Sequence, residues 1–173
     1  RSTLFPYTTL FRSLELFVPS LGRSFTGPMT REEFSRAVDA FVPSSNYMYA
    51  LRVTGQFAWA SARTVTKQDR PYRPMIEATD GEEIARHEDF SGTIAGFRTP
   101  LYESGISVAG CHAHIIDDDR TWGGHLVDFV LEEGEAELCL GTDFRMRLPL
   151  TEEFRTADLS EDKAEEIRRV EHH

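Results

Sequence analysis

The 173-residue sequence predicts an α+β fold, with antiparallel or mixed β-sheets and few helices. Most patterned segments alternate apolar and polar residues with the period of two that is typical of half-buried strands. Gly, Pro and acidic residues separate these segments, as expected for turns. Only two segments, near residues 30–41 and 160–171, carry apolar residues at helical spacing. The length is sufficient for one good hydrophobic core or two small ones.

Residues 1–13 differ in character from everything that follows them. They nearly repeat Thr-Leu-Phe and lead into no patterned element. They resemble the translated read-through of a sequencing adaptor, so we expect the native protein to begin near Leu14 and to have lost its true N-terminus. A genuine short hairpin is the alternative.

A first helix is predicted to begin after Thr30. Thr30 and Glu33 fit a capping box, in which the Thr side chain accepts from a first-turn amide and the Glu side chain reaches back. Pro43 ends the helical pattern. The apolar residues that recur at helical spacing are Phe34, Ala37, Val38 and Phe41.

Strands are predicted along most of the remaining chain. A long one starts near Asn46 and continues beyond Gly55. The residues expected on one of its faces are Tyr47, Tyr49, Leu51 and Val53, followed by Phe57 and Trp59. Further strands are predicted at residues 92–97, 135–140 and 144–148.

Charge and hydropathy narrow the function classes. A formal net charge of −10 opposes nucleic-acid binding, which requires clustered Lys and Arg. No apolar run reaches the roughly 18–20 residues of a membrane helix, and no secretory signal pattern is present, so we expect a cytoplasmic protein. The two cysteines, Cys111 and Cys139, allow at most one disulfide, and both are expected to be buried thiols.

Three histidines give the strongest chemical signal in the chain. In a strand, His112 and His114 would project from one face roughly 6.6 Å apart, whereas Cys111 would face the other way. A turn is predicted over residues 117–124, because Asp and Gly are concentrated there, and a strand-like run follows it. The hairpin would return His125 to a position beside His114.

Three neutral imidazoles leave one coordination position of a tetrahedral zinc ion open, which is the catalytic arrangement. We therefore expect His112, His114 and His125 to bind Zn²⁺, although such a set also accepts nickel, cobalt, iron or copper. The alternative is that these histidines only decorate a polar sheet face. Neither a Gly-rich dinucleotide fingerprint nor a P-loop is present.

The second predicted helix begins after Ser160 and extends through Ala164, Ile167 and Val170. Glu171 falls on the same stripe, four residues after Ile167. From the residues alone, a solvated Glu171 at a fraying chain end is the simpler interpretation. His172 and His173 are interpreted as a tail.

With these elements placed, residues 49–171 resemble alpha-acetolactate decarboxylase. The matching blocks are Tyr49-Ala50-Leu51-Arg52-Val53-Thr54-Gly55, Arg63-Thr64-Val65-Thr66-Lys67-Gln68-Asp69-Arg70-Pro71-Tyr72, Gly92-Thr93, Gly96-Phe97, Thr99-Pro100 and Gly110-Cys111-His112-Ala113-His114. The order and spacing of these blocks are much more specific than any single block.

The resemblance implies a two-domain fold, a homodimer and zinc-dependent conversion of (S)-2-acetolactate to (R)-acetoin and carbon dioxide. The family's zinc-binding histidines match His112, His114 and His125. An active-site arginine matches Arg63, and a glutamate that reaches the metal from the last helical segment matches Glu171. The resemblance therefore favours a functional Glu171 over a solvated one.

One part of the family pattern is missing. The family has a further active-site glutamate in a Leu-Asp-Gly-Glu-type segment of its first domain, and Glu15, Glu32 and Glu33 stand in a different context. We therefore expect a truncated first domain, of which residues 14–45 are a remnant, after a foreign segment 1–13. Residues 46–173 would form the metal-binding catalytic domain.

Two other classes share part of this pattern. Plant and prokaryote conserved (PPC) domains, which are non-catalytic oligomerisation or DNA-associated modules, can carry His-x-His followed by Gly-Gly-His but lack the block around Arg63. Cupin-like oxygenases also place two histidines on one strand, but they add a nearby carboxylate ligand. Asp117, Asp118 and Asp119 are better interpreted as turn residues, of which one could orient a histidine.

Overall fold

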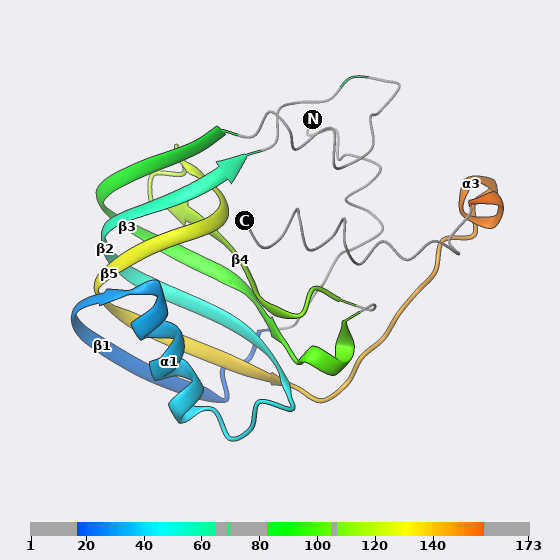
Figure 1. The fold of residues 1–173 in the computed structure, drawn as a ribbon, viewed down its shortest axis with the longest axis horizontal. Coiled ribbons are helices and arrows are strands. Elements are labelled where there is room, and N and C mark those ends of the chain that lie inside the picture. Colours follow the sequence, from blue (N-terminus) through cyan, green and yellow to red (C-terminus); the bar gives the residue numbers. More distant parts are fainter. Residues whose placement is uncertain (1–16, 65–68, 70–82, 105–106, 158–173) are drawn as a thin grey trace.

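The computed structural model describes residues 17–64, 69, 83–104 and 107–157. These residues form one strongly curled antiparallel sheet with an α-helix packed on it (Figure 1). The sequence-based expectation of an antiparallel sheet with few helices is confirmed. In chain order the elements are β1 (Leu21–Thr30), α1 (Arg31–Phe41), β2 (Met48–Thr64), β3 (Glu83–Thr99), the short 3₁₀ helix η2 (Leu101–Glu103), β4 (Gly110–Asp117), β5 (Gly123–Gly141) and α3 (Glu152–Thr156).

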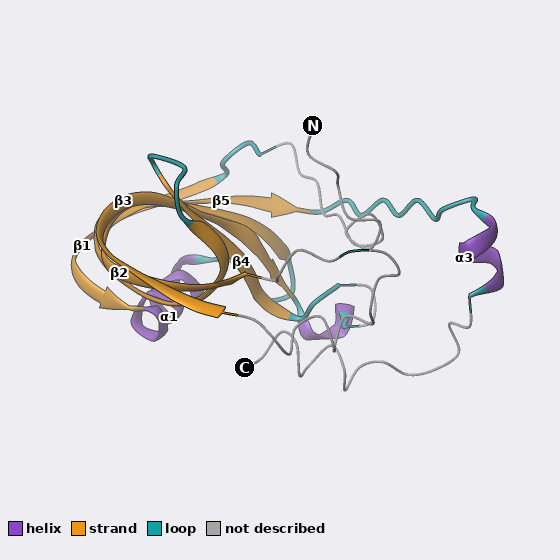
Figure 2. Cartoon of the chain, turned by 90° about the horizontal axis from the view of Figure 1, so that it is seen from above, coloured by secondary structure: helices purple, strands orange, loops and turns teal. Residues whose placement is uncertain are grey.

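The strands lie in the order β1-β5-β2-β3-β4, and β4 also pairs with β5. Four strands, β2 to β5, therefore close on themselves, as the curl in Figure 2 shows. Strand β5 is long enough to pair with β4 near its beginning and with β1 along its later half, while β2 lies on its other side. The closure brings the start of β5 between the ends of β4 and β2.

Helix α1 begins as the sequence predicts. The Thr30 hydroxyl accepts from the Glu33 amide at 3.3 Å, and the Thr30 amide donates to the Glu33 carboxylate at 2.9 Å. The helix ends at Phe41, because Pro43 disfavours helical backbone at the residue before it. The apolar side of the helix faces the sheet through Phe34 and Val38.

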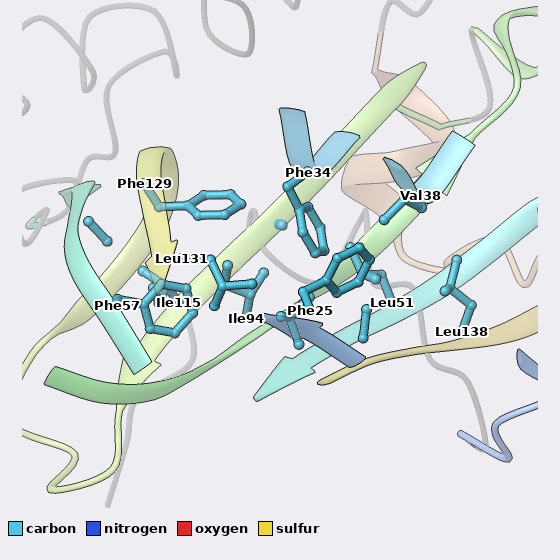
Figure 3. Close-up of a cluster of buried hydrophobic side chains, with 14 of the residues drawn as sticks. Phe25, Phe34, Val38, Leu51, Phe57, Ile94, Ile115, Phe129, Leu131 and Leu138 are labelled. Carbon is cyan, nitrogen blue, oxygen red and sulfur yellow. The ribbon is translucent and has the colours of Figure 1, made fainter. Parts of the chain in front are cut away.

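The core lies between α1 and the inner side of the curled sheet (Figure 3). Phe34 packs between Phe25 of β1 and Phe129 of β5, with ring centroids 5.1 and 5.6 Å apart. Phe129 in turn contacts Phe57, which stacks on Phe90 at 5.3 Å. These aromatic rings join the helix to four strands, β1, β5, β2 and β3. The largest fully buried side chains are Tyr49, Phe57, Ile94, Leu131, Leu138 and Val53.

Residues on both sides of the expected boundary at residue 46 share one sheet and one core. Strand β1 pairs along β5, and Phe25, Phe34 and Val38 join the same core as β2–β5. The assignment of residues 14–45 to a first-domain remnant stays a prediction. The expected foreign segment 1–13 lies outside the described residues.

The long strand β2 is confirmed, but its predicted face is not continuous. Tyr49, Val53 and Phe57 are buried, whereas Trp59 is only half-buried and Ala60 takes the core position. The pairing of β2 with β5 shifts register between Phe57 and Trp59. A bulge of this kind inverts the side-chain alternation beyond it, so Trp59 faces away from the core.

Two further expectations are wrong. Residues 144–148 form no strand; they are extended without a sheet partner among the described residues, and Phe144 is 60% exposed. Their alternation of apolar and polar residues is compatible with a strand. A strand also needs a neighbouring strand to pair with, which this pattern does not guarantee. Cys111 is exposed, because it lies near the start of β4, whereas Cys139 is buried as expected.

Candidate metal centre

The β4–β5 hairpin brings the three predicted histidines together. His112 and His114 lie on β4, and His125, near the start of β5, is the direct cross-strand partner of His114. The ring centroids are 4.9 Å apart for His112 and His125, and 5.4 Å apart for each of the other two pairs. The geometry that the sequence predicted for the hairpin is therefore present.

Alternation along β4 separates the centre from the core. Ala113 and Ile115 are buried on one face, while His112 and His114 project from the other. The histidines therefore leave the packing of the core undisturbed and stay accessible to an ion.

Two glycines before His125 allow β5 to approach both of its neighbours. A Cβ atom on Gly123 would lie 2.5 Å from the Ile115 carbonyl oxygen of β4. A Cβ atom on Gly124 would lie 2.7 Å from the Arg63 carbonyl oxygen of β2. The sequence interpretation assigned these glycines to a turn, but they belong to the strand. Gly-Gly at the start of a strand pattern is the signal for such close backbone contact.

Arg63 lies beside the histidines on β2. It is the cross-strand partner of His125, so His125 stands between Arg63 on one side and His114 on the other. Only 8% of Arg63 is exposed. The closed ring of strands thus places a buried guanidinium close enough to His114 and His125 to lower their pKa values.

The surroundings keep two of the imidazoles neutral. Burial, followed by the charge of Arg63 and the neighbouring His112 and His114, lowers the pKa of His125 from 6.5 to about 3. Burial, His112 and Arg63 also lower the pKa of His114. A neutral imidazole has the free lone pair that a metal ion requires, so these side chains are prepared as ligands at neutral pH.

The donor set fits a zinc-like ion. One ligand atom from each histidine can be chosen so that all three lie within 4.8 Å of one another. An ion held about 2.05 Å from each nitrogen in tetrahedral geometry requires the nitrogens to lie about 3.3 Å from one another. Three nitrogen ligands leave a fourth position for a substrate atom or water. Among the described residues, no carboxylate belongs to this group.

Two parts of the predicted site are not placed. Glu171 and its predicted helix lie outside the described residues, as does most of the block from Lys67 to Tyr72.

A hollow of about 570 Å³ lies elsewhere, lined by Gln56, Asp89, Glu132 and Glu133 among others, and none of the three histidines lines it. No helix in the described part of the chain is long and apolar enough to cross a membrane.

Comparison with known proteins assigns the chain to a family. The sequence profile described as alpha-acetolactate decarboxylase matches residues 4–161. The alpha-acetolactate decarboxylase of Bacillus subtilis (strain 168) is 40% identical over 149 residues, 86% of this chain and 58% of that protein. The one from Methanosarcina mazei is 37% identical over 139 residues, 80% of this chain and 48% of that protein. The chain spans about half to three-fifths of the length of these curated relatives.

Solved structures agree with this assignment. The crystal structure of alpha-acetolactate decarboxylase from Bacillus subtilis strain 168 has a TM-score of 0.84 to this fold, at 38% identity, over 90% of this chain and 67% of that one. A Staphylococcus aureus protein described as similar to alpha-acetolactate decarboxylase also has a TM-score of 0.84, at 29% identity. The expected acetolactate-decarboxylase-like fold is therefore confirmed.

Proposed function

Because the chain belongs to the alpha-acetolactate decarboxylase family, we propose that the whole protein decarboxylates (S)-2-acetolactate to (R)-acetoin and carbon dioxide. The observation that carries the proposal is the convergence of three imidazoles beside the buried Arg63. This combination offers both a metal site and a fixed positive charge for an anionic substrate. The family match favours this activity over the PPC and cupin alternatives.

His112, His114 and His125 would hold the ion, which we propose is Zn²⁺. When bound, it would supply Lewis acidity that stabilises the negative charge left on the substrate when carbon dioxide departs. The low pKa values of His114 and His125 support this role, because protons compete weakly with a cation for these nitrogens. His114 and His125 therefore do not have to lose a proton for the ion to bind at neutral pH.

Arg63 would bind the substrate carboxylate. A guanidinium can make two parallel hydrogen bonds to a carboxylate, which fixes its orientation as well as its position. Strand pairing holds the Arg63 backbone opposite that of His125, so the bound carboxylate and the metal centre would keep a fixed relation. Burial of Arg63 would strengthen the attraction by excluding water.

Glu171 would deliver a proton to the carbon that loses carbon dioxide. This role rests on the family resemblance, because Glu171 lies outside the described residues. A carboxyl group near the metal centre could act as a general acid if its surroundings adjust its pKa. Delivery from one side of the substrate would set the configuration of acetoin. A homodimer and a cytoplasmic location complete the proposal.

The test is acetoin release from racemic acetolactate by the whole protein, with bound metal counted in the same sample. We expect about one zinc per chain and acetoin enriched in the (R) form. H125A should lose both metal and activity. R63A should keep its metal but lose roughly 10- to 100-fold in kcat/KM, as expected when a charged hydrogen-bonding group is removed. A folded protein that binds zinc without producing acetoin would refute the decarboxylase and favour a non-catalytic metal-binding role.

A further inference from the structure

Asp117, the last residue of β4, has an unusual environment for a turn carboxylate. It is only 5% exposed and lies on the face of β4 opposite the histidines. One carboxylate oxygen accepts from the backbone amides of Thr121 and Trp122, at 2.8 and 3.0 Å. The other accepts from the Thr121 hydroxyl at 2.7 Å. Chiefly through the Trp122 amide, these bonds lower the pKa of Asp117, so the group is ionised at neutral pH.

The same turn is fixed by its backbone. The Asp117 amide donates to the Trp122 carbonyl oxygen at 3.0 Å, and the Arg120 amide donates to the Asp117 carbonyl oxygen at 3.1 Å. Arg120 has the left-handed backbone (φ 58°) that closes the loop. The Asp118 amide donates to Ser91 of β3, which joins the turn to the next strand.

This turn sets the register that places His125. Moving away from the turn along both strands, Gly123 pairs with Ile116, Gly124 with Ile115, and His125 with His114. A slip of one residue in a hairpin moves every side chain of the returning strand to the opposite face. His125 would then face the core, and the three imidazoles could not share an ion.

The long pairing of β5 with β2 is interrupted shortly before it reaches His125. Ser61 pairs with Asp128, but Ala62 pairs with Leu126, so a bulge at Val127 interrupts the ladder. Before the bulge, two pairs join β5 to β2, Ala62 with Leu126 and Arg63 with His125, and the pairs with β4 add to them. Strand β4 is joined to β5 by a turn, and the Asp117 side chain stabilises this turn through its hydrogen bonds to Thr121 and Trp122.

We propose that Asp117 is a positioning residue of the metal centre. Its carboxylate fixes the β4–β5 register and thereby keeps His125 beside His114. The inference rests on the proposed metal binding, but it concerns a residue that touches neither the ion nor the substrate. It also identifies which of the three consecutive aspartates has a role, because Asp118 and Asp119 are exposed.

The test compares D117A, D117N and D118A in the whole protein. D118A is the matched control, because it removes the same charge from the adjacent exposed position. In D117A we expect zinc, measured by competition with a chromophoric chelator, to bind roughly 10- to 100-fold more weakly. In the metal-free protein, the cross-strand NOE between backbone protons of His114 and His125 should weaken as well. D117N should retain most of the zinc affinity and most of the NOE intensity, because its amide oxygen still accepts from Thr121 and Trp122.

Equal zinc affinity and equal NOE intensity in D117A and D118A would overturn the positioning role. If D117A does not fold, T121V replaces it, since it removes only the hydroxyl bond. Its zinc affinity should fall in the same direction by a smaller factor, and an unchanged affinity would again overturn the proposal. Failure of the proposed metal binding is distinguishable, because it shows as absent zinc binding in the unsubstituted protein. Failure of the proposed reaction shows as zinc binding without acetoin release.

Discussion

The two ends of the curled sheet are held together by different kinds of contact. At the α1 end, Phe34 fills space between aromatic side chains of β1 and β5. At the β4–β5 end, backbones meet so closely that Gly123 and Gly124 have no room for a Cβ atom. Side-chain packing can relax around a change, whereas backbone pairing must keep its register. Stability and site geometry should therefore respond to different substitutions.

The largest effect on stability is expected at the α1 end. F34A removes a buried ring that contacts Phe25 and Phe129, and it should lower the free energy of unfolding by about 3–5 kcal/mol. Urea unfolding followed by circular dichroism measures the change. Well below the unfolding midpoint, the zinc affinity of F34A should be unchanged, because Phe34 contacts Phe129 of β5, which lies on the other side of the bulge at Val127 from His125.

F34L is the milder companion variant, since it keeps most of the apolar volume. If zinc affinity falls together with stability in both F34L and F34A, the two ends of the sheet are coupled. Stability and site geometry would then not respond to different substitutions.

At the hairpin end, the expected loss of stability is smaller and the loss of metal is larger. In G124A the new Cβ atom would lie 2.7 Å from the Arg63 carbonyl oxygen, so β5 must move away from β2. We expect a destabilisation of about 1–3 kcal/mol. Displacement of His125 should also abolish stoichiometric zinc, measured by elemental analysis after dialysis.

G22A is the matched control for this glycine. It lies in β1, and a Cβ atom there would come no closer than 3.9 Å to the nearest atoms outside its immediate chain neighbours. Replacing a strand glycine under such conditions should leave stability unchanged or raise it slightly. Zinc retained by G124A at the level of G22A would show that the close approach of β5 is not required.

The sequence was sufficient where structure is set by neighbouring residues. The capping box at Thr30 and the stop at Pro43 place α1, and the spacing of His112, His114 and His125 places them on one face of a hairpin. These features depend on periodicity and turn chemistry, which are local.

The sequence was insufficient where structure depends on distant strands. Trp59 leaves the predicted face because of a bulge against β5, and residues 144–148 lack a sheet partner among the described residues. Burial of Arg63 follows from the closure of four strands into a ring, which no single segment encodes. The sequence likewise did not show which of the three consecutive aspartates stabilises the turn through side-chain hydrogen bonds; in the structure it is Asp117.

The smallest expected effect is the pH dependence of the unfolding free energy of the metal-free protein. The pKa of His125 is about 3 in the fold and near 6.5 in the unfolded chain, so between these values the unfolded chain binds more protons. The unfolding free energy of the metal-free protein should therefore be highest above pH 6.5 and decrease as the pH falls from 6.5 toward 5. Solvent screening of a half-exposed side chain keeps the change modest. H125A should show a shallower dependence, because His114 remains, whereas F34L should keep the full slope at lower stability. Equal slopes in H125A and the unsubstituted protein would mean that the hairpin does not hold this imidazole neutral.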